Sequence, residues 1–524
     1  MMNRLSGLDG VSLHGETPVM PTHVLAVAFV DPSARGDLTA GALVRLLAER
    51  ATAIPEFRQR LLTKPFGLGQ PAWVEDPAID IHDHLHRARL TEPGTMRELT
   101  AFIGELHAQP LDRRRPLWEA WVVQGLSDGR LVVVIKFSHA LADGVGAVTS
   151  LLPELMTADP HAEFVEPQRS TATTPTMPGL TERVRDAIDE VAANSATGLR
   201  VTAKLAPVAL KSVIGSAAGS VRQFITGTEP QRATASDAQR DESSPPSRLN
   251  APLTTRRSVA FAGVPMDDLH AITAAFGVTI NDVFLTATTS ALRRWLETYE
   301  AVPSSPLRTM MPISTRGVDD NSSNSWSTVA VTLPVHLGSA AAQLASIHET
   351  TSSIKEARSS TPPVNLADVI DLVPPALIGL VSGLYSSLKL SRFHSPVAHA
   401  ITSNVPGPVE ALYAAGAHVL GIHAMAPLVG ANLNVTAVSY ASTFAVGLVA
   451  CPDNVEDVAS IARAIEDVVG ELKIAAEEKS GYGAAAACAG LAERAVALTN
   501  TPQFTPAEKR ASAQPGIPGR KQPA

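Results

Sequence analysis

The chain has 524 residues, a length that predicts two hydrophobic cores with flanking tails rather than a single core. Hydrophobic residues make up 45% and charged residues 18%, which excludes an intrinsically disordered chain. The formal net charge of −8 argues against a nucleic-acid-binding protein, and the two cysteines, Cys451 and Cys488, exclude a disulfide framework and fit no zinc spacing.

The first half of the chain alternates predicted strands and helices. A strand is predicted over residues 24–30 and helices over 40–51 and 96–108. The apolar run 131–137 is typical of a buried central strand, and a further helix is predicted over 145–156. These elements define an N-terminal αβ domain, for which we predict the boundaries 1–165.

The composition changes near residue 160. Residues 180–225 have a helical pattern, and residues 229–247 are polar and include Pro245 and Pro246, which is typical of a linker. We therefore predict a helical and polar connector over residues 166–250.

A second αβ unit starts near Arg257 and predicts a C-terminal domain over residues 251–480. Its predicted elements are helices over 267–275, 281–299 and 455–472 and strands over 307–312, 327–333, 434–438 and 444–449. The last two strands lie in an uncharged stretch, 411–452, which polar residues such as Asn432 interrupt; this favours a hairpin over a transmembrane helix. Residues 501–524 predict a disordered tail.

The uncharged segment 372–388 has two interpretations. It could form a core helix, or an amphipathic element that lies on a lipid surface, and its prolines and serines leave it short of a membrane span. Residues 1–15 lack the apolar segment of a secretory signal. We expect a cytoplasmic location and leave open a peripheral attachment to a membrane or to lipid inclusions.

The heptad Ser-His-Ala-Leu-Ala-Asp-Gly, residues 138–144, directly follows the predicted central strand. A neutral imidazole at a strand end can accept a proton from a hydroxyl group near neutral pH, so His139 is a candidate base. The alternative is structural: such a histidine can simply be half-buried and hydrogen-bonded, and Asp143-Gly144 can be an ordinary turn.

This heptad resembles the HHxxxDG motif of acyl-CoA-dependent acyltransferases, and in detail that of the wax ester synthase/diacylglycerol acyltransferase family. Further segments resemble the same family in order and spacing: Arg4–Asp9, Glu16–Pro18, Pro110–Asp112, Arg115–Glu119, Asn281–Val283, Met311–Arg316 and Ser403–Pro408. One departure is clear, because Ser138 occupies the position of the first motif histidine.

The resemblance implies an α/β fold with two chloramphenicol-acetyltransferase-like domains in one chain and a tunnel between them. It implies His139 as the general base and Asp143 as a residue that organises the loop. Fatty acyl-CoA would be a substrate, and neither a cofactor nor a metal is implied. The acceptor would be diacylglycerol, giving triacylglycerol, or a long-chain alcohol, giving a wax ester.

The oxyanion of the tetrahedral intermediate needs hydrogen-bond donors. Backbone N–H groups near Gly144, or the side chains of Asn281 and Asn404, are the candidates, and the sequence does not choose among them. Pro116 and Trp118 are expected to be packing residues.

Two rival functions stay open. The chain could acylate another lipid hydroxyl, or it could be a catalytically impaired protein that binds lipid or acyl-CoA, because Ser138 breaks the usual histidine pair. A metal site is a further alternative, since His82, His84 and His86 alternate along a predicted strand. We favour a polar strand edge there, because no fourth ligand is near in the sequence.

Overall fold

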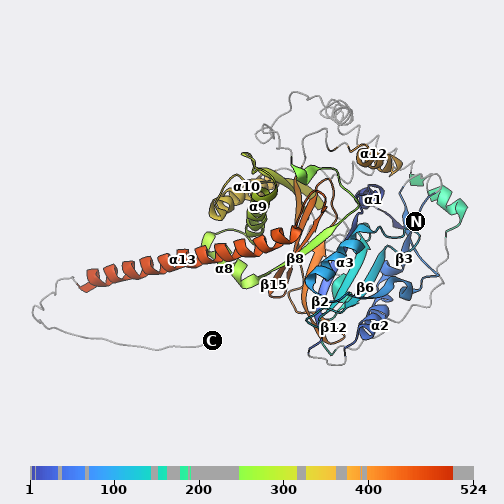
Figure 1. Cartoon of the computed structure of the whole chain (residues 1–524), viewed down its shortest axis with the longest axis horizontal. Helices are drawn as coiled ribbons and strands as arrows, with labels where there is room; N and C mark the ends of the chain where they lie inside the picture. Colours follow the sequence, from blue (N-terminus) through green and yellow to red (C-terminus); the bar gives the residue numbers. More distant parts are fainter. Residues whose placement is uncertain are drawn as a thin grey trace, which may run out of the picture.

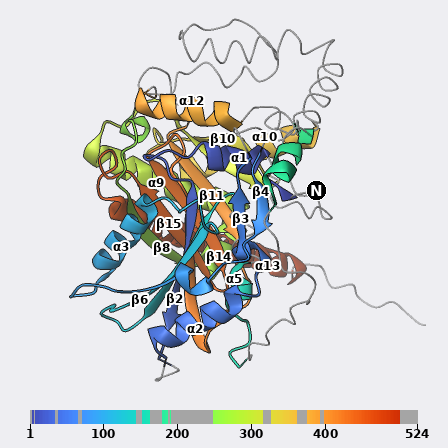
Figure 2. The ribbon, with the colours of Figure 1, turned by 90° about the vertical axis from the view of Figure 1, so that its right-hand side faces the viewer.

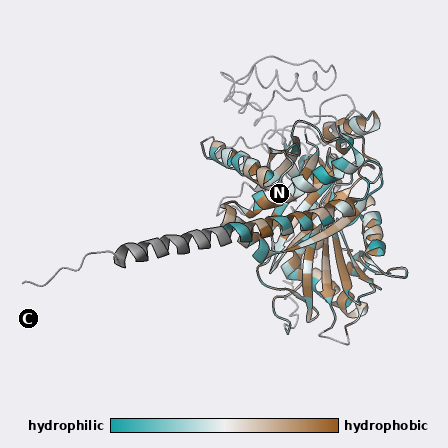
Figure 3. Ribbon diagram, turned by 60° about the vertical axis from the view of Figure 1, so that its left-hand side comes forward, coloured by the Kyte–Doolittle hydropathy of each residue, from teal (hydrophilic) through white to brown (hydrophobic). Residues whose placement is uncertain are grey.

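The computed structural model describes residues 3–5, 7–33, 38–64, 70–142, 151–161, 178–186, 189–190, 247–314, 326–360, 375–389, 391 and 398–499. Two six-stranded sheets lie next to each other, and helices cover them (Figure 1). The strands of both sheets are predominantly hydrophobic (Figure 3). The predicted α/β class is confirmed.

The first sheet has the strand order β12-β13-β2-β7-β6-β5. Its strands are β2 His23–Asp31, β5 Leu85–Arg89, β6 Trp118–Gln124, β7 Leu131–Ser138, β12 Tyr413–Ala414 and β13 Ala417–Met425. All eight residues of β7 are buried because helices cover both faces of the sheet. Val133 and Ile135 share a core with helix α2 (Ala40–Ala51), whereas Val132 and Val134 share one with α3 (Met96–Ala108).

The second sheet has the order β10-β9-β11-β14-β15-β8. Its strands are β8 Ser258–Pro265, β9 Leu307–Ser314, β10 Trp326–Leu333, β11 Ala400–Pro406, β14 Leu433–Tyr440 and β15 Thr443–Ala450. One large core joins this sheet to the helices α8 Met266–Phe276, α9 Ile280–Tyr299, α10 Ala340–Ser360 and α13 Val458–Thr499. The predicted hairpin is confirmed, because β14 and β15 pair in antiparallel fashion.

Strand β13 joins the two halves of the molecule. It belongs by sequence to the second half, yet it pairs with β2 of the first sheet, from His418 opposite Asp31 to Met425 opposite Leu25. The segment 413–425, which lies within the predicted C-terminal unit 251–480, thus completes the first sheet.

Smaller elements gather near the N-terminus. A three-stranded sheet has the order β1-β4-β3, with β1 Asn3–Arg4, β3 Gln59–Leu62 and β4 Ala72–Glu75. Helix α1 (Gly7–His14) packs against α12 (Pro375–Ser387), and both lie at the same end of the molecule (Figure 2). Among the described residues, no single helix is long and apolar enough to cross a membrane. The bent pair of α8 and α9 has sufficient length and apolar composition only when the two helices are taken together.

The three alternating histidines do not lie on one strand. Residues Ile81–His84 form a 3-10 turn, and only His86 is on β5. His84 is buried and stacks on Trp118, while His86 contacts Trp121. The predicted strand over His82 and His84 is wrong, because Asp80 caps a 3-10 turn by accepting the His82 N–H.

Candidate active site

His139 lies in the turn that directly follows β7, and its side chain is half-buried. Its backbone N–H donates to the carbonyl oxygen of Thr22, at 3.4 Å, just before β2 begins. The Ser138 hydroxyl is buried and accepts the Ala140 N–H at 3.2 Å, which closes the turn from within. Two neighbouring strands therefore fix the backbone that carries the candidate base.

The turn rests on a small apolar cluster of its own. This cluster consists of Leu5, Leu13, Leu61, Leu111, Leu117 and Ala140. Leu5, Leu111 and Leu117 come from three of the segments that carry the family resemblance, and Ala140 comes from the heptad itself. These three segments, which are far apart in the sequence, therefore pack together in the cluster that supports the histidine turn.

Glu16 connects the N-terminal segment to the same turn. Its carboxylate accepts the backbone N–H and the hydroxyl of Thr22, both at 3.3 Å, and a guanidinium N–H of Arg113 at 3.1 Å. The Thr22 hydroxyl lies 2.7 Å from the Ser12 carbonyl oxygen as well. Because the Thr22 carbonyl receives the His139 N–H, Glu16 holds the strand that positions His139. Thr22 was missed from the sequence, where nothing marks a threonine before a strand.

Buried basic groups lie on the α3 side of the same strand ends. Burial lowers the pKa of Lys136, whose Nζ donates to the Gln109 carbonyl oxygen at 2.6 Å. His23, which pairs with Ser138, donates from Nε2 to the His107 carbonyl oxygen at 3.0 Å. Burial lowers the pKa of His107 to about 3 and keeps the pKa of His23 well below its usual value. These histidines stay neutral near pH 7, and the ammonium faces the C-terminal carbonyls of α3.

Asn281 lies at the start of α9, and its side chain is near the Met311 sulfur, at 3.6 Å. Its neighbour Asp282 is buried and accepts hydrogen bonds from the Thr279 N–H and the Thr351 hydroxyl, at 2.9 and 2.7 Å. His348 lies 2.8 Å from the same carboxylate, and these partners together lower the pKa of Asp282 against the effect of burial. The Asn-Asp segment thus caps α9 and joins it to α10.

Asn404 is half-buried on β11, opposite Ala437 of β14. Gly407 follows it at a point where a side chain has no room, because a Cβ there would meet the Ser439 carbonyl oxygen at 2.4 Å. Asn281 and Asn404 thus both belong to the second sheet and its helices, and their described contacts lie there. Asp143 and Gly144 lie outside the described residues.

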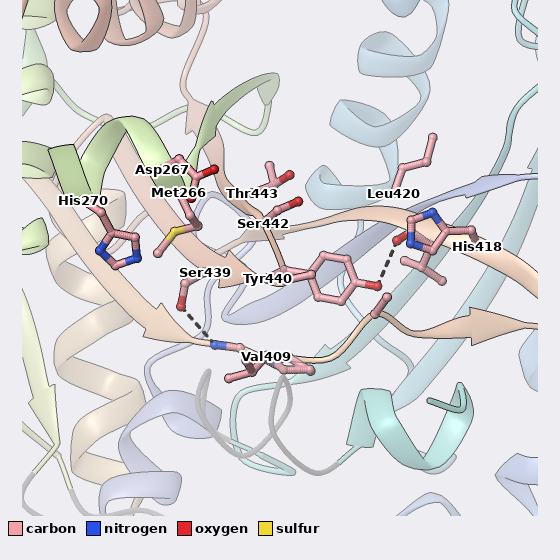
Figure 4. Close-up of a pocket in the computed structure, with 15 residues that line it drawn as sticks. Met266, Asp267, His270, Val409, His418, Leu420, Ser439, Tyr440, Ser442 and Thr443 are labelled. Atoms are coloured by element: carbon pink, nitrogen blue, oxygen red, sulfur yellow. Dashed lines mark hydrogen bonds between the residues drawn. The ribbon is translucent and has the colours of Figure 1, made fainter. Parts of the chain in front are cut away.

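A cavity of about 590 Å³ lies beyond the end of β14 (Figure 4). Its lining includes His270 of α8, His418 of β13 and Tyr440, whose hydroxyl donates to the Val419 carbonyl oxygen at 2.9 Å. Strand β2 runs from His23, opposite Ser138, to Asp31, opposite His418. At about 3.3 Å per residue, the cavity and the His139 turn are at opposite ends of the first sheet.

Comparison with known proteins identifies the lineage of the chain. The family model described as the wax ester synthase/diacylglycerol acyltransferase catalytic domain matches residues 5–284, and the model of the corresponding C-terminal domain matches residues 322–473. The chain belongs to the wax ester synthase/diacylglycerol acyltransferase family. It is therefore an acyltransferase, and the resemblance carried by its motifs is confirmed.

Relatives within the family match most of the chain. A putative diacylglycerol O-acyltransferase of Mycobacterium tuberculosis is 32% identical over 475 residues, which cover 90% of this chain and 90% of its own. A putative diacylglycerol O-acyltransferase of Mycobacterium bovis is 31% identical over 479 residues, which cover 90% of this chain and 96% of its own.

Solved structures share the fold. The wax ester synthase/diacylglycerol acyltransferase from Marinobacter aquaeolei VT8 is similar with a TM-score of 0.65 and 24% identity, covering 91% of this chain and all of its own. A trichothecene 15-O-acetyltransferase from Fusarium sporotrichioides has a TM-score of 0.51 and 12% identity, covering 90% of this chain and 94% of its own. The predicted two-domain architecture of CoA-dependent acyltransferases is thus confirmed. Within the described residues, no group of three His, Cys, Asp or Glu side chains is arranged to hold a metal ion.

Proposed function

We propose that this enzyme transfers a fatty acyl group from acyl-CoA to the hydroxyl of a diacylglycerol or a long-chain alcohol, with His139 as the general base. The imidazole removes the hydroxyl proton while the oxygen attacks the thioester carbonyl carbon. The tetrahedral intermediate then expels the CoA thiolate, which takes the proton back from the imidazolium. The new ester bond replaces the thioester bond, and no covalent enzyme intermediate is needed.

The observation that supports this proposal is the anchoring of the His139 turn. Its backbone bonds to Thr22, the Ser138 hydroxyl closes it, and an apolar cluster lies beneath it. A base contributes most when the protein holds it rigidly near the reacting hydroxyl. Asp143 is proposed to organise the rest of this loop. Backbone N–H groups near Gly144, or the amides of Asn281 and Asn404, remain proposed donors to the oxyanion.

The test uses labelled palmitoyl-CoA with either dioleoylglycerol or hexadecanol as acceptor. We expect His139→Ala to lower kcat about a hundredfold or more, because general bases contribute on that scale. His82→Ala is the matched control, since His82 is an exposed histidine of the same sheet region. Ester formation by His139→Ala at the wild-type rate would overturn the role of His139.

The acceptor distinguishes the rival functions. Ester formation from dioleoylglycerol or hexadecanol supports the proposal. Ester formation only from another lipid hydroxyl would show instead that this other lipid is the acceptor. Tight binding of palmitoyl-CoA without ester from any acceptor would favour a lipid-binding or acyl-CoA-binding homologue.

Ser138 bears on that last rival. Its side chain is buried on the face it shares with His23 and is bonded to the turn itself, so it acts on the backbone. We therefore expect Ser138→His not to raise kcat, because the hydroxyl that closes the turn is lost and no catalytic contact is restored on that face. A rise of tenfold or more in the same assay would show instead that the departure from the histidine pair impairs catalysis.

A further inference from the structure

Helix α12 turns its small and polar side chains toward the protein, whereas a helix that packs on a core turns its apolar side chains inward. Its small residues face the protein: a Cβ on Gly379 would lie 3.4 Å from the His14 carbonyl oxygen, and the Ser386 hydroxyl lies 3.4 Å from that of Thr17. Ser382 faces the same way, since its hydroxyl would meet a Cβ on Gly15 at 3.7 Å. The polar, small side of the helix is therefore the one that packs on α1 and the chain after it.

The opposite side of α12 is apolar and open to solvent. The exposed fractions are 59% for Leu380, 44% for Val381 and 47% for Leu384, and 59% for Leu388, which directly follows the helix and bonds through its N–H to the Leu384 carbonyl oxygen. At about 100° per residue, these four side chains lie within one arc of about 100°. Isolated exposed leucines are ordinary, but a continuous apolar stripe on one helix marks a surface that meets another apolar phase.

This stripe lies at the end of the molecule that carries the candidate base. Gly15 and Thr17, which contact α12, precede Thr22, whose carbonyl receives the His139 N–H. Helix α12 and α1 occupy the same end in two perpendicular views (Figures 1 and 2). A lipid layer on this stripe would therefore lie at the His139 end of the molecule.

The charge around the stripe favours an anionic surface. The sequence has no aspartate or glutamate between Asp371 and Glu410, although the whole chain carries a net charge of −8. Lys389, directly after the stripe, is exposed, and Arg392 follows in the sequence. A basic group next to an apolar helix face matches the head groups and acyl chains of an anionic lipid layer.

We propose that the outward face of α12 docks this enzyme on an anionic lipid surface, so that a water-insoluble acceptor can pass from that surface to the His139 end. The docking rests on α12 alone, whereas the delivery of acceptor rests also on the proposed function. The lipid layer would cover Leu380, Val381, Leu384 and Leu388, and Lys389 would lie among the head groups.

The first experiment measures sedimentation of the full chain with phosphatidylcholine vesicles that contain phosphatidylglycerol. We expect Leu380→Ser together with Leu384→Ser to weaken vesicle partitioning about tenfold or more, because two large side chains lose their apolar burial. Lys389→Glu should weaken it only for vesicles that contain phosphatidylglycerol. Ile474→Ser is the matched control, since Ile474 on α13 is 58% exposed, and it should bind like wild type.

Far-UV circular dichroism and the thermal midpoint establish that each variant is folded. Wild-type protein that stays in the supernatant, or a folded double variant that binds as tightly as wild type, would overturn the docking. Light scattering tests the alternative that a second copy of the chain covers the stripe. A wild-type dimer that becomes a monomer in the double variant, with no vesicle binding by either protein, would also overturn the docking.

The second experiment compares dioleoylglycerol held in vesicles with hexanol dissolved in water as acceptor. The docking variant should lose most of its rate with the vesicle acceptor and keep the wild-type rate with hexanol. Equal losses with both acceptors would overturn the delivery role of α12. If wild type esterifies neither acceptor, the proposed function fails, and the vesicle-binding experiment still decides the docking.

Discussion

Glu16 illustrates how a carboxylate outside the histidine turn can hold the segment to which the candidate base is bonded. Its carboxylate bonds to the backbone and the hydroxyl of Thr22, and the Thr22 carbonyl in turn receives the His139 N–H. The glutamate is also paired with Arg113, so its own position is fixed. This arrangement makes Glu16 a positioning residue, since among the described contacts it reaches the candidate base through Thr22.

We expect Glu16→Gln to lower kcat about three- to tenfold with little change in KM, because a small displacement of a catalytic group costs rate more than binding. Steady-state kinetics with palmitoyl-CoA, together with the pH dependence of kcat, would measure this. Asp112→Asn is the control, because Asp112 is likewise a carboxylate paired with an arginine, Arg114, but it has no bond to the turn. An equal decrease of kcat in the two variants, or an increase of KM without a decrease of kcat, would contradict the positioning role.

At the scale of elements, the sequence predicted helices and strands well where the apolar residues of a segment repeat with a single helical or strand spacing. Helices α2 and α3 begin and end where their apolar spacing predicts, and β7 extends the predicted strand by one residue. The partner of a strand was not predictable, because alternation does not say which sheet it joins; β13 is the example. The sequence did not predict the turn over His82 and His84. The Asp80 side chain caps this turn through one local hydrogen bond, and the alternation of histidines gives no sign of that bond.

The candidate site was predictable only in part. The strand end that carries His139 follows from the apolar run before it, and the motif segments follow from the family resemblance. Their convergence on one cluster involves Leu5 and Ala140, which are 135 residues apart, and no local pattern encodes such a contact. For a similar reason the sequence does not decide whether residues 372–388 form a core helix or a helix that lies on a lipid surface, since the burial of an amphipathic helix depends on what packs against it.

Strand β15 provides a test of how closely the two sheets approach. A Cβ on Gly447 would lie 2.2 Å from the Ala424 carbonyl oxygen of β13, so the sheets can meet there only because this residue has no side chain. We expect Gly447→Ala to lower the free energy of unfolding by about 1–3 kcal/mol. Denaturant unfolding would measure the change. Gly263→Ala on the adjacent strand β8 is the control, because its Cβ would meet only Thr443, at 4.0 Å, and a loss as large as that of Gly447→Ala would contradict the argument.

At the scale of the whole molecule, buried histidines connect stability to pH. His423 of β13 lies between the sheets, with its ring against Phe29 of β2 and Phe261 of β8. Burial lowers the pKa of His423 to about 4 and the pKa of His107 to about 3. An unfolded histidine takes up its proton near pH 6.5. Below that pH the unfolded state binds more protons than the folded state, so the free energy of unfolding falls as the pH is lowered.

We expect the free energy of unfolding to fall by about 2 kcal/mol for each of these two histidines between pH 7 and pH 5, since both remain neutral in the folded protein over that window. Denaturant unfolding at several pH values measures the slope of the unfolding free energy against pH, which is proportional to the difference in bound protons between the unfolded and folded states. His423→Leu keeps an apolar side chain between Phe29 and Phe261 and should lower that difference by about one proton at pH 5. A variant with the wild-type slope would mean that His423 is protonated in the folded state, and a polar path to solvent would then have to run between the sheets.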